Sequence, residues 1–262
     1  SIESSLDHID HCAWNNRRHH TLCGRRFAQD ANITLLSNRV GTHALRRHHC
    51  RVDQFELLDA RPREERRAMR ADRSQPHDDH TGARNALLAA AVARVARFRG
   101  LTVAAINGYC LGAGLEFALA CDVRICEEHA QLGLPEARVG LLPCGGGTQR
   151  LPWLVGEGWA KRMILCGERI GAQQAQTLGL VEEVVPKGEA LAAATALAAK
   201  VGSQSPSSIA ACKRLIHSAR DKAIADGLVA ERDEFVALFS TEDQQEGTNA
   251  FLEKREPEWK NR

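Results

Sequence analysis

The chain has 262 residues, of which 44% are hydrophobic and 26% are charged, and its formal net charge is +2. These are ordinary values for a globular protein, and they leave no excess of positive charge that would indicate a nucleic-acid partner. No apolar run approaches the ~20 residues that a membrane-spanning helix needs, and residues 1–11 lack the basic-then-apolar order of a secretion signal.

The first eighty residues differ in composition from the rest of the chain. Nine of the eleven histidines fall in residues 1–80, and no lysine precedes Lys161. Arginine-rich runs such as HALRRHHCR show little of the alternation that a half-buried strand requires. Only ITLL, at 33–36, predicts a strand here, and RPREERRAMRA, at 61–71, is compatible with a charged helix that opens on a proline.

From residue 82 the pattern alternates between helices and strands, which indicates an α/β architecture. An alanine-rich helix is predicted over 82–100 and ends at Gly100. The next run, LTVAAING at 101–108, is almost continuously apolar, so we expect a strand that is buried on both faces. The later predicted elements are a helix at 115–122, a strand at 123–128, a strand and loop at 130–143, a glycine-rich turn into a helix at 144–156, and a helix and strand at 170–186.

The last sixty residues carry only helical signals. Ser205 and Pro206 open one helix, because proline is tolerated in a first turn. Apolar residues then recur at roughly helical spacing, at Leu228, Phe235 and Leu238. We therefore expect an α/β core over 1–200 and a helical region over 201–262 that serves packing or oligomerisation. Residues 1–80 are assigned to the core although they match the α/β pattern poorly.

The stretch Cys110–Asp122, CLGAGLEFALACD, places Glu116 directly after a Gly-Ala-Gly turn and at the start of an apolar helix. A carboxylate in a first helical turn commonly complements the positive end of the helix dipole. The same turn also presents unpaired backbone N–H groups that can bind a developing oxyanion. A carboxylate beside that oxygen would be well placed as a general acid or base.

Two further motifs are weak when taken alone. Glu136 follows Pro135 in GLPEARVG, where a glutamate is usually just solvated. The glycine-rich PCGGGTQR at 143–150 lacks the lysine pattern of a phosphate-binding loop, so a flexible turn is the better interpretation. Only the order and spacing of the three motifs make a case for a site.

Together these motifs resemble the crotonase superfamily, the enoyl-CoA hydratases and isomerases. The resembling stretches cover about three-fifths of the chain: AAINGYCLGAGLEFALACDVRI, LGLPEARVGLLPCGGGTQRLPWLVG, AKRMILCGERIGAQQAQTLGLVEEVVP and the terminal FLEKREPEW. The resemblance implies a crotonase-like spiral of repeated β-β-α units with a C-terminal helical oligomerisation region. It also implies a homotrimer, or a hexamer built as a dimer of trimers.

The resemblance implies roles for individual residues. Glu116 and Glu136, twenty residues apart as in the family, would flank an acyl-CoA thioester. Glu116 would activate water and Glu136 would exchange the proton at the α-carbon. The amide of Ala113, next to Gly112, would be one oxyanion donor. The expected activity is reversible addition of water to a 2-enoyl-CoA, with coenzyme A as part of the substrate and no separate cofactor.

This sequence departs from the family pattern in two places. Cys144 stands where the family has the first glycine of its P-G-x-G-G turn, so we expect its thiol side chain to crowd the bound water or acyl chain. The family's AGAD-like segment, which supplies the first oxyanion donor, is only faintly echoed around Ala68 and Met69, whose amides are the candidates here. Either this half has diverged or its sequence is locally wrong.

Other features favour simpler interpretations. Nine cysteines without a CxxC pair indicate buried reduced thiols in a cytoplasmic protein. The doublets His19-His20 and His48-His49 point their neighbouring side chains apart, so we expect no metal site. Acidic residues nearly cancel the early arginines, so RNA binding is not expected.

Three alternatives to the hydratase reading remain. The chain could be an enoyl-CoA isomerase, or an acyl-CoA dehydratase that makes unsaturated fatty-acid signals. It could also be a catalytically inactive crotonase-like binding protein, with RNA as one candidate ligand, if the incomplete first oxyanion site has ended catalysis. Isomerases often manage with one carboxylate, so the presence of both Glu116 and Glu136 favours addition or removal of water.

Overall fold

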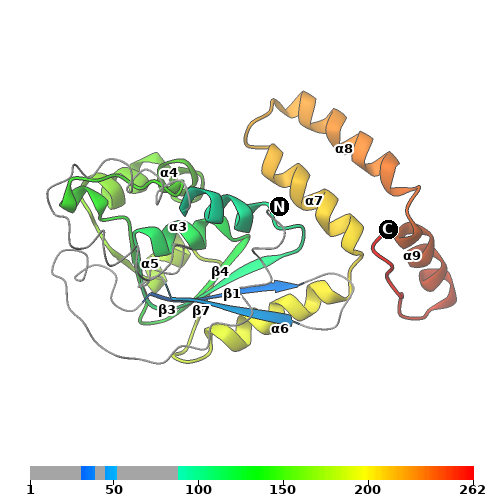
Figure 1. Cartoon of the computed structure of the whole chain (residues 1–262), viewed down its shortest axis with the longest axis horizontal. Coiled ribbons are helices and arrows are strands. Elements are labelled where there is room, and N and C mark those ends of the chain that lie inside the picture. The colour runs from blue at the N-terminus through cyan, green and yellow to red at the C-terminus, as the bar shows by residue number, and fades with distance from the viewer. Residues whose placement is uncertain (1–30, 39–44, 52–87) are drawn as a thin grey trace, which may run out of the picture.

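The computed structural model describes residues 31–38, 45–51 and 88–262, which form a mixed sheet with helices on both faces and a helical segment at one side (Figure 1). The α/β class expected from the sequence is confirmed. The charged helix expected at 61–71 and the candidate residues Ala68 and Met69 lie outside the described residues.

The main sheet has the strand order β2-β1-β3-β4-β7. The first two neighbours in this order pair antiparallel, and β1 also pairs antiparallel with β3. The pairs β3–β4 and β4–β7 are parallel. The bounds are β1 Ala31–Asn38, β2 Leu45–Arg51, β3 Thr102–Leu111, β4 Val123–Glu127 and β7 Glu183–Val185.

Strand β3 is longer than the sequence predicted and serves two sets of partners. Its first part pairs with β1 and β4, and its last three residues, from Tyr109, pair with β5 (Gln131–Gly133). Between the two parts Gly108 has a φ of 89°, a left-handed conformation that favours glycine. Strand β5 also pairs with β6 (Ile170–Gly171). The far end of β3 therefore leads directly into the region of the candidate site.

Both faces of β3 are buried, as the apolar run predicted. Ala104 and Ile106 belong to one core cluster, which they share with Leu115 and Leu151 from the helices above the sheet. Val103 and Ala105 belong to a second cluster on the opposite face of the sheet, which contains alanine side chains of α6 (Ala190–Gly202). Alternate residues of a strand point to opposite faces, so a continuous apolar run fits a strand that is covered on both sides.

The helices above the sheet begin where glycine turns end. Helix α3 (Ala113–Ala120) starts two residues earlier than the sequence predicted, because two residues of the Gly-Ala-Gly turn are already helical. A helix over 88–96 packs against α3 through Leu88 and Val92. Helix α4 (Gly147–Leu165) is kinked at Gly156, whose φ of 76° is not helical. The shorter α5 spans Ala172–Thr177.

The C-terminal segment is helical, and it extends away from the sheet (Figure 1). It contains α7 (Pro206–Ser218), α8 (Ile224–Leu238) and α9 (Glu242–Glu253). The Nζ of Lys213 on α7 donates to the Oδ2 of Asp122 at 2.7 Å and to the carbonyl of Gly100 at 2.9 Å. These bonds join α7 to the core. No described helix is long and apolar enough to cross a membrane.

Two elements differ from the sequence prediction in an instructive way. Strand β2 contains the run LRRHHCR, in which we predicted no strand. Its backbone pairs with β1 along the whole of its length, so pairing across the sheet overrides the side-chain pattern. Glu136, expected in an open loop, is the first residue of a 3₁₀ turn, Glu136–Val139. The boundary that we expected between residues 200 and 201 lies near the end of α6, and the division into a core and a helical region stays a prediction.

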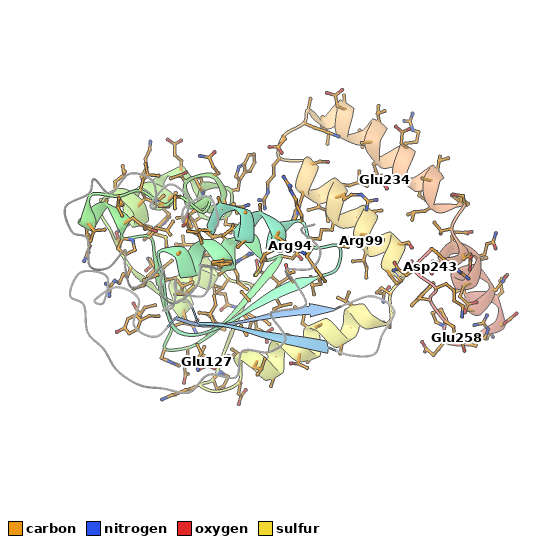
Figure 2. All side chains as sticks on the ribbon, viewed as in Figure 1. Arg94, Arg99, Glu127, Glu234, Asp243 and Glu258 are labelled. Carbon is orange, nitrogen blue, oxygen red and sulfur yellow. The ribbon has the colours of Figure 1, made fainter. Side chains whose placement is uncertain are left out.

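Asp243 joins three parts of the C-terminal segment and is only 1% exposed (Figure 2). Its carboxylate accepts bonds from the hydroxyl groups of Ser205 and Ser207 at the start of α7, at 3.2 and 2.9 Å. It also accepts from the backbone N–H groups of Lys260 and Asn261, both at 2.8 Å. Burial raises the pKa of Asp243, but the hydrogen bonds outweigh burial and leave this pKa below its usual value.

We predict that Asp243→Ala lowers the free energy of unfolding by about 1–3 kcal/mol at neutral pH, because two partly buried N–H groups and two hydroxyl groups lose their acceptor. The lowered pKa means that the carboxylate stabilises the fold above the unfolded-state value of ~3.9 and that this contribution is lost as the pH falls. Urea denaturation at several pH values measures both effects. Asp233→Ala, at an exposed position of α8, is the control, and equal losses in the two variants would contradict the assignment.

Candidate active site

The start of α3 presents a free backbone donor. Gly112 precedes the helix with a φ of 57°, and its own N–H donates to the carbonyl of Gly133 at 3.0 Å. No hydrogen bond among the described residues uses the N–H of Ala113, the first residue of α3. The first N–H groups of a helix have no partner within the helix, so this amide is available to an oxygen of a ligand.

Glu116 is 1% exposed and does not cap its own helix. Its Oε1 accepts from the backbone N–H of Gly145 at 2.7 Å and from that of Gly147 at 2.8 Å. Gly147 is the first residue of α4, so the carboxylate of one helix lies at the N-terminus of another. Burial raises the pKa of Glu116 above its usual value, and this effect outweighs the lowering by the two amides and by the charge of Arg150.

The glycines of the 145–147 turn make room for this carboxylate. A Cβ on Gly145 would lie 2.8 Å from the Oε2 of Glu116, and a Cβ on Gly147 would lie 2.8 Å from a Cδ of Leu134. Distances below 3.0 Å force an atom to move. The backbone therefore approaches the carboxylate closely only because both positions are glycine.

Glu136 lies against the Gly112 turn. Its Oε1 is 3.3 Å from the place that a Cβ on Gly112 would occupy, and its Oε2 is buried without a hydrogen-bond partner in the described part of the chain. Burial raises the pKa of Glu136 to about 7, and the negative charge of Glu116 contributes to that shift. The two carboxyl groups thus lie close enough for Glu116 to influence the titration of Glu136.

Cys144 precedes the turn that binds Glu116, and its thiol is exposed. Burial raises the pKa of this thiol, and the charges of Glu116 and Glu136 raise it further, so the sulfur lies near both carboxylates. A raised pKa keeps the thiol protonated at neutral pH. The side chain adds bulk next to the pair but carries no charge.

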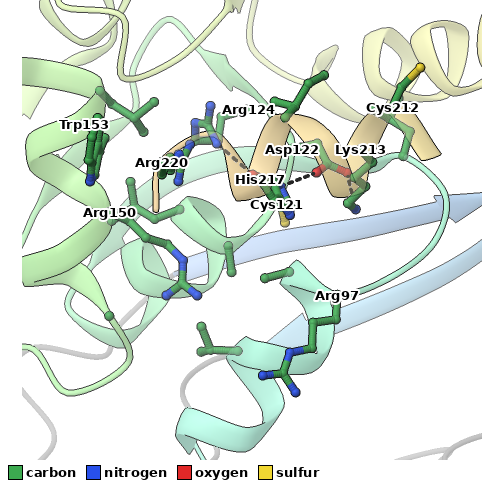
Figure 3. A pocket seen from close by; sticks show the side chains of 18 of the residues that line it. Arg97, Cys121, Asp122, Arg124, Arg150, Trp153, Cys212, Lys213, His217 and Arg220 are labelled. Carbon is green, nitrogen blue, oxygen red and sulfur yellow. Dashed lines mark hydrogen bonds and ion pairs between the residues drawn. The ribbon is translucent and has the colours of Figure 1, made fainter. Parts of the chain in front are cut away.

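A cleft of about 1360 Å³ lies beyond the same turn, between the core and α7 (Figure 3). Cys144, Gly145 and Gly146 line one wall, and neither glutamate lines it. The opposite wall carries Lys213 and His217 of α7, which face Asp122. The cleft and the glutamate pair therefore share the glycine turn as a common wall.

The structure thus brings together most of the residues that the sequence singled out: Gly112, Ala113, Glu116, Glu136 and Cys144. Sequence reasoning missed that the turn amides bind Glu116, and it missed Arg150 altogether. The pattern GGGT before a helix was the available signal, because a glycine-rich helix start can bind any anion, including a side-chain carboxylate. No group of three potential metal ligands occurs among the described residues.

Two interacting carboxyl groups, one of them titrating about pH 7, beside a free helix-start amide are typical of enzymes that move protons next to a developing oxyanion. The particular family follows from comparison with known proteins. The chain belongs to the enoyl-CoA hydratase/isomerase family, whose model matches residues 72–262.

Curated relatives carry hydratase names. The chain is 46% identical over 170 residues to the 2,3-dehydroadipyl-CoA hydratase of Escherichia coli, a match that covers 65% of this chain and 67% of the relative. It is 42% identical over 161 residues to the short-chain-enoyl-CoA hydratase of Clostridium acetobutylicum, covering 61% and 62%. Across the similar curated proteins, the matched part spans between 52% and 67% of the relative's length.

Solved structures share the fold. DspI of Pseudomonas aeruginosa is 55% identical with a TM-score of 0.68, and the match covers 71% of each chain. An enoyl-CoA hydratase of Bacillus anthracis is 37% identical with a TM-score of 0.68, covering 73% of this chain and 74% of that one. The crotonase-type fold expected from the sequence is confirmed.

We predict that Glu136→Gln stabilises the protein at pH 8 more than at pH 5. The folded-state pKa of about 7 exceeds the unfolded value of ~4.3, so the parent loses stability as the pH rises from about 4 to 7, and a neutral amide escapes this loss. Thermal or urea denaturation at both pH values measures the difference. Glu128→Gln, at an exposed position, is the control, and a gain that does not grow with pH would refute the burial argument.

Proposed function

We propose that this protein is an acyl-CoA hydro-lyase that reversibly adds water to a 2-enoyl-CoA thioester. The observation that carries the proposal is the pair of interacting carboxyl groups, Glu116 and Glu136, near the Gly112–Ala113 helix start. Membership of the hydratase/isomerase family and the names of the relatives support the same reaction.

Glu116 acts as the base that activates water. Its Oε1 is engaged by the N–H groups of Gly145 and Gly147, which favour the ionised form, and its Oε2 remains to accept a proton. As the water oxygen attacks C3 of the enoyl group, the proton passes to this carboxylate. General base catalysis of this kind contributes about 10²–10⁴-fold.

Glu136 supplies the proton to C2. A carboxyl group with a pKa of about 7 is protonated in a large share of molecules at neutral pH, so it can donate. When the product leaves, the proton taken up by Glu116 returns to solvent and Glu136 is protonated again. The reverse sequence removes water, so a dehydratase of the same substrate class would use the same groups.

The amide of Ala113 binds the thioester oxygen. Addition at C3 places negative charge on that oxygen, and a preorganised N–H donor is worth a few kcal/mol in the transition state. Alanine here fulfils the role as well as glycine, because the donor is the backbone. The second donor is proposed at Ala68 or Met69. These groups supply both proton transfer and charge stabilisation, so the proposed reaction uses no cofactor besides the coenzyme A of the substrate.

An enoyl-CoA isomerase is the second candidate, and it is favoured by the family description itself. An isomerase moves a proton between two carbons, for which one carboxylate is sufficient. Here both glutamates are buried or half-buried and influence each other, which suits a reaction that handles a water proton and a carbon proton together. Loss of the conjugated-thioester absorbance of a short 2-enoyl-CoA distinguishes hydration from the alternatives.

We predict that Glu116→Gln and Glu136→Gln each lower kcat for hydration by about 10²–10⁴-fold. The double variant should lose far less than the product of the two single effects, because residues that act as a unit are not additive. Absorbance assays with purified protein measure kcat, and melting temperatures show whether folding survives. A Glu116→Gln protein that retains activity within a factor of about three would exclude the proposed base, given these magnitudes.

We further propose assembly into a homotrimer or a hexamer through the C-terminal helices. Helix α8 exposes large apolar side chains along its length, and such a contiguous surface marks an interaction site. The exposed residues of α8 are Ile224, Leu228, Val229, Phe235 and Val236, and Phe239 follows directly after the helix.

We predict that light scattering gives the mass of a trimer or hexamer, and that Phe235→Ser shifts the protein toward monomer. The polar side chain removes apolar area from the proposed contact and leaves the α/β core unchanged. Glu231→Ser, at an exposed position of the same helix, is the control. A monomeric parent at micromolar concentration would rule out the assembly.

A cytoplasmic location is proposed as well. Cys110, Cys121 and Cys126 lie close together in the core as free thiols, and burial raises the pKa of each. Neighbouring free thiols suit a reducing compartment.

A further inference from the structure

Arg150 contacts the backbone that binds Glu116. It lies in the first turns of α4, and its Nη1 donates to the carbonyl of Gly145 at 3.0 Å. The N–H of the same Gly145 donates to the Oε1 of Glu116 at 2.7 Å. One residue of the turn is thus held from both sides, by a guanidinium at its carbonyl and by a carboxylate at its N–H.

The turn is shaped to receive this guanidinium. Gly146 has a φ of 100°, and a Cβ there would lie 2.0 Å from the Nη1 of Arg150, which no side chain can do. A glycine at this position therefore serves two purposes. It adopts the left-handed conformation, and it leaves space for the arginine to lie against the backbone.

The charge of Arg150 acts on Glu116 from a distance, without a direct ion pair. Among the described residues no carboxylate lies within ion-pair distance of Arg150. Burial and the nearby charge of Arg220 lower the pKa of Arg150, and Glu116 raises it. Conversely, Arg150 lowers the pKa of Glu116. Figure 3 shows Arg150 and Arg220 on the wall of the same cleft.

We propose that Arg150 is a positioning residue for the hydration reaction: its guanidinium fixes the 145–147 turn so that two amides stay aimed at the carboxylate of Glu116. The inference rests on the proposed function of Glu116 as the base. Arg150 touches neither the reacting atoms nor the carboxylate itself, and it acts through the carbonyl of Gly145.

Loss of Arg150 has two separable consequences. Without the guanidinium the turn can relax, and misplacement of a catalytic group by about 1 Å can lower the rate on the order of 10²-fold. Without its positive charge the pKa of Glu116 rises, so the base is ionised only at higher pH. The other charged or titratable groups that face Glu116, namely Glu136 and Cys144, are unchanged by the substitution.

The test compares three variants with the parent by kcat, KM and pH profile. Arg150→Gln should lower kcat on the order of 10–10²-fold, leave KM within about twofold, and move the acidic limb of the profile to higher pH. Arg150→Lys keeps the charge but lacks the planar fork, so kcat falls while the acidic limb stays near that of the parent. Arg220→Gln removes a charge from the same cleft without touching the turn. This variant should leave both kcat and the acidic limb of the pH profile unchanged.

A second readout does not depend on turnover. Carboxyl-¹³C-labelled glutamate reports the titration of Glu116 by NMR, with the signal assigned by its absence in Glu116→Gln. The midpoint should rise in Arg150→Gln and stay in place in Arg220→Gln. If the parent fails to hydrate any 2-enoyl-CoA, the proposed function is wrong, yet this titration still tests the coupling between Arg150 and Glu116.

Three results would overturn the inference. An Arg150→Gln protein with the kcat and pH profile of the parent shows that the turn needs no arginine. Equal losses of kcat in Arg150→Gln and Arg220→Gln assign the effect to charge in the cleft. A fall of kcat that tracks a lowered melting temperature, with the Glu116 titration unmoved, assigns Arg150 a purely structural role.

Discussion

The hydrogen bonds that the amides of Gly145 and Gly147 donate to Glu116 are the constraint on which the rest of the site depends. A carboxylate with 1% exposure would be costly to ionise without them. They require a helix that starts at residue 147, a turn without side chains before it, and a second helix that carries Glu116 to the same place. Helices α3 and α4 are therefore fixed relative to each other by an anion at a helix N-terminus.

The same hydrogen bonds give the two glutamates different surroundings. Glu116 has two amide donors and an arginine nearby, whereas the Oε2 of Glu136 is buried without a partner among the described residues. Donors favour a charged carboxylate, and burial without donors favours a neutral one. Burial raises the pKa of both side chains, and only Glu116 has two backbone N–H donors and an arginine that counteract this effect. In the proposed reaction, the surroundings of the two glutamates rather than their residue type would separate the base from the acid.

Local and periodic signals of the sequence were sufficient for much of this fold. The apolar run of β3 predicted burial on both faces, and the Gly-Ala-Gly turn predicted a helix with Glu116 at its start. Strand β2 was missed because its arginines and histidines carry no strand pattern, and its pairing with β1 stabilises it instead. The partners of Glu116 were missed for a related reason. Gly145 and Gly147 are about thirty residues away in the chain, and no pattern within a short window reports which acceptor a free amide will find. In the sequence, Arg150 is indistinguishable from any other arginine of a helix, and only the structure shows that it contacts the carbonyl of Gly145.

Strand β3 links the sheet to the site mechanically. Its first half is clamped between two apolar layers, and after Gly108 the same strand continues for three residues before it delivers Gly112 and Ala113. The interior of a protein is close-packed, so a volume change at Val103 or Ala105 shifts the strand rather than being absorbed beside it. A substitution on the face of α6 that packs against β3 can consequently disturb the distant start of α3. The packing of α6 against β3 therefore bears on the alignment of a single backbone amide, that of Ala113, at the far end of the strand.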